Sequence, residues 1–264
     1  MNSHETAKPP ELPHVADATP SATKSQSGPW GFWATVGWGA IIGFGVLMLQ
    51  GGILFSFAYI QSHVTGRSIS ATADLARNGL MISVVTLATA PFVVCLCCLF
   101  AWLRRDYPFA NYLGLTLPRG KVVAVWIIGL VAYVLASDFL TLAMKRPIVP
   151  EFMIHAMETA VLPPFLCVAV IIAAPVSEEF FFRGFLLAGF QHSIGKWPAV
   201  VGTAGMWAII HLQYDPYQIM WVFAAGVLLG LARITTGSLL LCIFLHSLMN
   251  LIATVEAVIY LARR

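Results

Sequence analysis

The chain has 264 residues, of which 59% are hydrophobic and only 10% are charged, so it is far more apolar than an average soluble domain. Its net charge of +3 is small and spread over several segments, which excludes the basic surface expected of a nucleic-acid-binding protein. The composition predicts an all-α, polytopic membrane protein, a transmembrane bundle of about seven helices, within a range of six to eight.

The first segment, residues 1–28, is polar and free of periodicity, which predicts a disordered tail. Apolar sequence begins only at Trp30 and runs too long for a cleaved signal peptide, so we expect the first helix to be retained. Residues 29–109 are predicted to form the amino-terminal transmembrane helices, and residues 110–264 a second helical bundle. The seven predicted spans cover about residues 30–59, 79–103, 122–144, 162–190, 196–212, 217–234 and 238–261.

A shorter amphipathic segment at residues 150–160 predicts an interfacial helix between the third and fourth spans. The distribution of Lys and Arg over the loops favours a cytoplasmic amino terminus. The loop after the second span decides this balance, with Arg104, Arg105, Arg119 and Lys121.

Charged side chains interrupt the apolar fourth span in the stretch Pro-Val-Ser-Glu-Glu-Phe-Phe-Phe-Arg. A charge at membrane depth costs roughly 2.5–3.5 kcal/mol on insertion scales, which indicates a function and a nearby partner. Glu179 and Arg183 are four residues apart with the acid first, so they are predicted to pair on one helix face. Glu178 points about 100° away and is predicted to be free. Pro175 predicts either a kink or a restarted helix, and a restart would make Ser177 its N-cap.

Polar residues of the following spans are predicted to lie at a similar depth. The turn near Gly195 is 17 residues from Glu178 and 16 from His211, so an antiparallel helix pair places both side chains about 24 Å from that turn. His246 and Asn250 are four residues apart and share one face of the last span. Three helices are therefore predicted to supply polar groups to one interior cavity.

These residue types suit hydrolysis of a peptide bond by activated water. A Glu and a His that face one another can deprotonate a water molecule, and a His with an Asn can donate hydrogen bonds to the oxyanion of a tetrahedral intermediate. Such a mechanism needs no covalent nucleophile. Ser177 and Ser238 lie in no Gly-x-Ser-x-Gly elbow, which disfavours serine chemistry.

Three motifs occur in order on successive apolar segments, namely Glu-Glu-x-x-x-Arg from Glu178 to Arg183, an aromatic variant of Phe-x-x-x-His from Trp207 to His211, and His-x-x-x-Asn from His246 to Asn250. In this order the chain resembles the CAAX protease and bacteriocin-processing (CPBP, Abi) family of intramembrane endopeptidases, which includes the type II CAAX prenyl proteases. The resemblance covers about residues 110–262 and makes the second bundle the predicted catalytic one.

The resemblance implies a role for each motif residue: Glu178 and His211 would activate the water, His246 and Asn250 would bind the oxyanion, and Glu179 with Arg183 would hold the site together. It also implies an endopeptidase; for cofactors we expect none, with zinc as the alternative discussed below. The expected substrate is a membrane protein or membrane peptide, lipidated or not, and the expected location is a bacterial inner membrane.

Two alternatives stay open at this point. Glu178, His211 and His246 are acceptable zinc ligands with a vacant fourth position, but there is no His-Glu-x-x-His helix, and zinc would occupy the groups that water activation needs. We therefore favour hydrolysis without a metal. A non-enzymatic scaffold or immunity protein, or a proton-coupled transporter, would also carry charges inside the membrane. No inverted repeat is evident to support a transporter.

Overall fold

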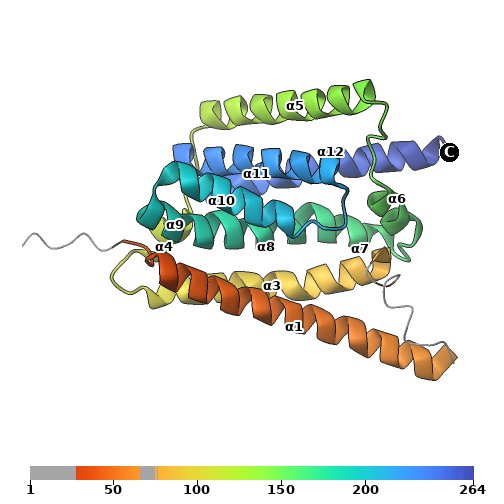
Figure 1. The fold of residues 1–264 in the computed structure, drawn as a ribbon, viewed down its shortest axis with the longest axis horizontal. Helices are drawn as coiled ribbons and strands as arrows, with labels where there is room; N and C mark the ends of the chain where they lie inside the picture. Colours follow the sequence, from red (N-terminus) through yellow and green to blue (C-terminus); the bar gives the residue numbers. More distant parts are fainter. Residues whose placement is uncertain (1–27, 66–74, 76) are drawn as a thin grey trace, which may run out of the picture.

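The computed structural model describes residues 28–65, 75 and 77–264, and this part of the chain consists of helices and connecting loops without a strand (Figure 1). The predicted tail at residues 1–28 lies outside the described residues except for its last position. Within these described ranges, six helices are long and apolar enough to cross a membrane. The prediction of an all-α, polytopic bundle is therefore confirmed, and the protein is an integral, multi-pass membrane protein.

The helices have the following bounds. The first half contains α1 (Phe32–Thr65), α3 (Gly79–Leu103), α4 (Phe109–Leu113), α5 (Gly120–Ala143) and α6 (Glu151–Glu158). A composite helix follows, made of α7 (Pro163–Val168), η2 (Ala169–Ala173), α8 (Ala174–Glu179), η3 (Phe180–Leu186) and α9 (Leu187–Ile194). The chain then continues through α10 (Lys196–Ile209), α11 (Pro216–Thr236) and α12 (Leu239–Ala262).

The predicted fifth span is the short helix α10, so the described residues contain six helices of spanning length, within the expected range of six to eight. Its 14 residues extend only about 21 Å, less than the thickness of a bilayer core. It still packs against α9 and α11 and returns the chain toward the far end of the bundle (Figure 1). Consequently α1 begins at one end of the bundle and α12 ends at the other.

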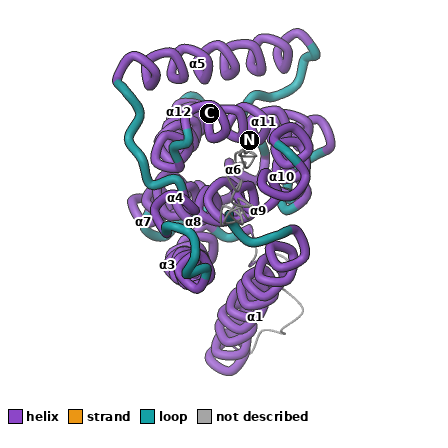
Figure 2. Tube along the Cα trace, turned by 90° about the vertical axis from the view of Figure 1, so that its left-hand side faces the viewer, coloured by secondary structure: helices purple, strands orange, loops and turns teal. Residues whose placement is uncertain are grey.

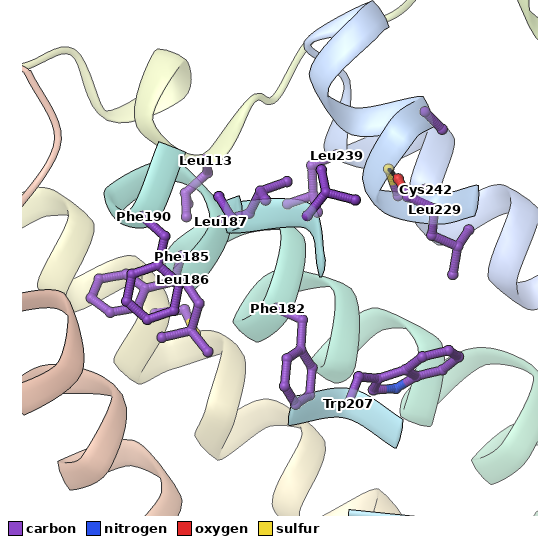
Figure 3. Packing of buried hydrophobic residues seen from close by; sticks show 14 of the residues in the cluster. Leu113, Phe182, Phe185, Leu186, Leu187, Phe190, Trp207, Leu229, Leu239 and Cys242 are labelled. Carbon is purple, nitrogen blue, oxygen red and sulfur yellow. Dashed lines mark hydrogen bonds between the residues drawn. The ribbon is translucent and has the colours of Figure 1, made fainter. Parts of the chain in front are cut away.

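The hydrophobic core surrounds the composite helix. Figure 3 shows part of it, with Phe185 of η3, Trp207 of α10 and Leu239 of α12 among the contributing side chains. α5 lies outside α11 and α12, while α1 lies on the opposite side and diverges from the bundle toward its carboxyl end (Figures 1 and 2). Both outer helices expose most of their apolar side chains, as lipid-facing helices do.

Pro175 does not restart the helix. The segment just before it, η2, is a π-helix, in which each N–H donates to the carbonyl five residues back. The N–H of Ala174 reaches the carbonyl of Ala169, but the next such bond would need an N–H on residue 175, which proline lacks. The carbonyl of Val170 therefore has no i+5 donor. Ser177 is no N-cap, because its hydroxyl donates to the carbonyls three and four residues earlier.

Candidate active site

A buried charge cluster forms the centre of the site. Glu179 and Arg183 are fully buried, and Arg183 Nη1 donates to Glu179 Oε1 at 2.9 Å, which is the ion pair that their spacing predicts. His246 Nδ1 lies 2.9 Å from the same oxygen. Arg183 Nη2 donates to the carbonyl of Gly226 at 3.1 Å. The cluster thereby joins the composite helix, α11 and α12.

Glu178 is only one residue away but has different surroundings. Its Oε2 accepts a hydrogen bond from the indole Nε1 of Trp207, so it contacts α10 rather than the ion pair. Glu178 also lines a cavity of about 520 Å³ between α1, α3 and the composite helix. The carboxylate is thus held on one side and faces an open space on the other.

His211 follows the last turn of α10, where its backbone N–H donates to the carbonyl of Ala208 at 3.1 Å. Its Nδ1 lies 2.7 Å from the carbonyl oxygen of Trp207. A carbonyl oxygen only accepts hydrogen bonds, so Nδ1 carries the hydrogen and the neutral ring keeps a lone pair on Nε2. The carboxylate of Glu179 is likewise an acceptor, so Nδ1 of His246 also carries a hydrogen. Each imidazole is therefore left with Nε2 for chemistry.

Asn250 lies one turn beyond His246 on α12, and its Nδ2 donates to the carbonyl of Val170 at 2.8 Å. This is the carbonyl that has no i+5 donor, because Pro175 follows the π-helix. A side-chain amide has two hydrogens, so one remains after this bond. The irregular part of the composite helix thus holds the Asn250 amide in place.

Trp207 connects the separate parts of the site. Its ring is buried and lies edge to face with both imidazoles, at centroid distances of 5.0 Å to His211 and 5.1 Å to His246. The guanidinium carbon of Arg183 is 4.7 Å from its ring centroid. From the sequence Trp207 was predicted only as a variant of Phe, and its bond to Glu178 was not predicted. The sequence does contain a signal for this bond, because a Trp buried four residues before an intramembrane His needs a hydrogen-bond acceptor for its indole N–H.

A second aromatic residue that the sequence analysis missed is Tyr214, in the loop between α10 and α11. Its ring stacks on His211, with centroids 6.0 Å apart and ring planes at 12°, and meets Phe152 of α6 edge to face at 5.9 Å. Burial, followed by the charge of Glu178, raises the pKa of Tyr214 to about 12. The Tyr214 hydroxyl therefore stays protonated at neutral pH.

The positions of the three predicted zinc ligands can be compared with the zinc alternative. Within residues 28–65, 75 and 77–264, no three His, Cys, Asp or Glu side chains lie close enough together to hold a metal ion. A zinc site would require Glu178, His211 and His246 on one ion. Here Glu178 binds Trp207, and His246 binds Glu179.

Comparison with known proteins finds a family similar to this region. Residues 160–252 match the family described as Rce1-like type II CAAX prenyl endopeptidases, and all six predicted site residues lie within this stretch. Over 127 residues the chain is 30% identical to an uncharacterized 24.3 kDa protein of Escherichia coli, a match that covers 46% of this chain and 58% of that protein. No solved structure matches the chain. The match of residues 160–252 confirms the resemblance of this region to the CAAX protease and bacteriocin-processing family.

Proposed function

We propose that the protein is an intramembrane endopeptidase that hydrolyses a peptide bond of a membrane protein or membrane peptide. The observation that carries this proposal is the meeting of Glu178, His211 and His246 around one buried indole. Among the described residues both imidazoles bond through Nδ1, and neither Nε2 has a hydrogen-bond partner. The similarity of residues 160–252 to a family of endopeptidases supports the same reaction class. The proposal concerns the whole protein, whereas the family match covers residues 160–252.

In the proposed mechanism Glu178 and His211 take the proton from a water molecule while its oxygen attacks the carbonyl carbon of the substrate. The C–O bond forms as the carbonyl becomes an oxyanion. Collapse of this intermediate breaks the C–N bond, and the proton passes from the base to the departing amine. Because the water itself is the nucleophile, no acyl-enzyme forms.

The oxyanion needs donors, and two are available across the site. His246 has its Nδ1 hydrogen committed to Glu179, so it donates from Nε2 when the ring is protonated. The remaining amide hydrogen of Asn250 is the second donor. Donors that are fixed before the reaction stabilise developing charge without reorganising, which is the usual source of a large rate increase.

The substrate is proposed to reach Glu178 through the cavity between α1, α3 and the composite helix. Apolar side chains dominate its lining, and the polar residues are Gln50, Thr86, Thr89, Ser177 and Glu178. This composition suits a largely apolar peptide segment that presents one backbone carbonyl to the carboxylate. A membrane-inserted substrate, lipidated or not, has this character.

We favour water activation without a metal, because the hydrogen bonds of Glu178 and His246 hold them in separate networks. Stoichiometric metal that stays on the purified protein after a chelator wash, together with loss of activity once it is stripped, would overturn this preference. A scaffold or immunity function without catalysis is the other outcome to be tested.

The test compares membranes of cells that carry the wild-type protein or Glu178→Gln, with amino-terminal peptides identified by mass spectrometry. Glutamine keeps an acceptor oxygen for Trp207 and removes only the base. We expect uncleaved precursors to accumulate in Glu178→Gln and also in His211→Ala. Identical peptide sets in wild type and both variants, with the biological activity retained, would instead show a binding protein.

A further inference from the structure

We propose that Trp207 is a positioning residue whose indole N–H fixes the carboxylate of Glu178, so that one oxygen stays bound to the protein and the other faces the cavity. The inference rests on the proposed function. Its starting point is the hydrogen bond from Trp207 Nε1 to Glu178 Oε2. The motif that the chain resembles has Phe at this position, and Phe has no N–H that could donate to Glu178.

The ring of Trp207 is itself immobilised. The two imidazoles lie against it edge to face at 5.0 and 5.1 Å, and the guanidinium of Arg183 covers it at 4.7 Å. On α11 the backbone of Gly226 approaches so closely that an added Cβ would lie 3.1 Å from Trp207 Cε3 and 3.0 Å from the Cβ of Ala204. The indole donor is therefore held in position from several sides.

A rigid donor matters because a Glu side chain is flexible. Glu178 lines a cavity, so its carboxyl group is not packed against protein on every side. A charge-assisted hydrogen bond to a fixed donor selects one orientation before the substrate arrives. Trp207 acts only through Glu178 in this account, so its loss should slow the chemical step without weakening substrate binding.

The first test replaces Trp207 by Phe, which keeps an aromatic ring and removes the donor. The matched control is Trp221→Phe on α11, because the Nε1 of Trp221 is buried without a hydrogen-bond partner among the described residues. We expect kcat of Trp207→Phe to fall about tenfold at unchanged KM, the effect of losing a hydrogen bond to a charged group. Trp221→Phe should keep both constants.

A second readout does not depend on turnover. Dicyclohexylcarbodiimide modifies carboxyl groups inside membranes, and mass spectrometry of the peptide separates modification of Glu178 from that of Glu179. Freed from the indole, both oxygens of Glu178 can react, so labelling should be several-fold faster in Trp207→Phe than in wild type and Trp221→Phe. Glu179, bound to Arg183 and His246, serves as the internal reference.

A further variant covers the case in which Trp207→Phe does not fold. Gly226→Ala leaves the indole N–H in place but displaces the ring of Trp207. As in Trp207→Phe, kcat should fall and labelling of Glu178 should become faster. If the variants only lower the melting temperature, with kcat and labelling as in wild type, Trp207 is structural and the inference is overturned. If Glu178→Gln still turns over, the proposed function fails instead, and the labelling rates still decide whether the indole restrains Glu178.

Discussion

Two adjacent glutamates of this protein carry out different tasks in our account. Glu179 is fully buried and shares one oxygen between Arg183 and His246, whereas Glu178 borders a cavity and accepts from Trp207. The helical period explains why they diverge, since neighbouring residues point about 100° apart. Their substitutions should therefore separate stability from activity.

Glu179→Gln should lower the free energy of unfolding by about 3–5 kcal/mol, because it leaves the charge of Arg183 buried and uncompensated. Glu178→Gln should unfold close to wild type and lose hydrolysis. Thermal unfolding in detergent, followed by thiol labelling of the buried cysteines, measures the first effect. Equal melting temperatures for the two variants would contradict the structural role of Glu179.

At the residue scale, the sequence predicts the Glu179–Arg183 pair from spacing and the common depth of Glu178 and His211 from the antiparallel turn. The bond of His246 to Glu179 rather than toward Glu178 could not be read from the sequence, because it depends on how α12 is rotated against the composite helix. The role of Trp207 depends likewise on the rotation of α10.

At the scale of a single element, the composite helix shows how an irregularity becomes useful. The sequence indicates a disturbance at Pro175 but cannot distinguish a kink from a restart. The structure has no restart: a π-helical segment precedes Pro175, and the carbonyl of Val170, which finds no N–H at residue 175, accepts from Asn250 instead. Local irregularities of this kind are frequent at functional sites.

Pro175→Ala tests this link. The new N–H competes for the carbonyl of Val170 and releases the amide of Asn250, so kcat should fall by about tenfold, short of the roughly 100- to 1,000-fold cost of losing an oxyanion donor. The melting temperature should stay equal or rise, because a proline leaves the helix interior. Pro91→Ala, at an exposed position inside α3, is the matched control and should keep kcat. A wild-type kcat in Pro175→Ala would show that the π-helix does not contribute to positioning Asn250.

At the scale of the whole molecule, the fold combines the site-bearing bundle with helices that lie outside the family match. α1 and α3 form one wall of the cavity beside Glu178. The sequence predicts these spans from their length and hydropathy, but it does not show that α1 borders the site, since that is a matter of tertiary packing. The number of membrane spans is also hard to predict from the sequence, because the 14 residues of α10 extend only part of the way across a bilayer core.

The cavity can be filled without disturbing the fold. A Cβ added at Gly43 would meet nothing within 4 Å, and Gly43 lines the cavity. Gly43→Leu should therefore raise KM by about tenfold with little change in melting temperature. Gly37→Leu, on the same helix at a position equally open but outside the cavity, should leave KM unchanged. Equal KM values in the two variants would mean that the substrate enters elsewhere.

The path of the chain predicts where its ends lie. α1 begins at one end of the bundle and α12 ends at the other, so the two termini should lie on opposite sides of the membrane (Figure 1). With the cytoplasmic amino terminus favoured by the Lys and Arg distribution, a carboxyl-terminal alkaline phosphatase fusion should be active. A carboxyl-terminal fusion that fluoresces in the cytoplasm would place both ends on one side.

The central claim is that Glu178 activates water for peptide-bond hydrolysis. The most direct measurement uses purified wild-type and Glu178→Gln protein in lipid vesicles, with a precursor that accumulates in the variant's membranes, in ¹⁸O-labelled water and a chelator. We predict that the wild type cleaves the precursor and adds labelled oxygen to the new carboxyl terminus, while Glu178→Gln, with the same melting temperature, cleaves nothing. Cleavage by Glu178→Gln at the wild-type rate would contradict the account.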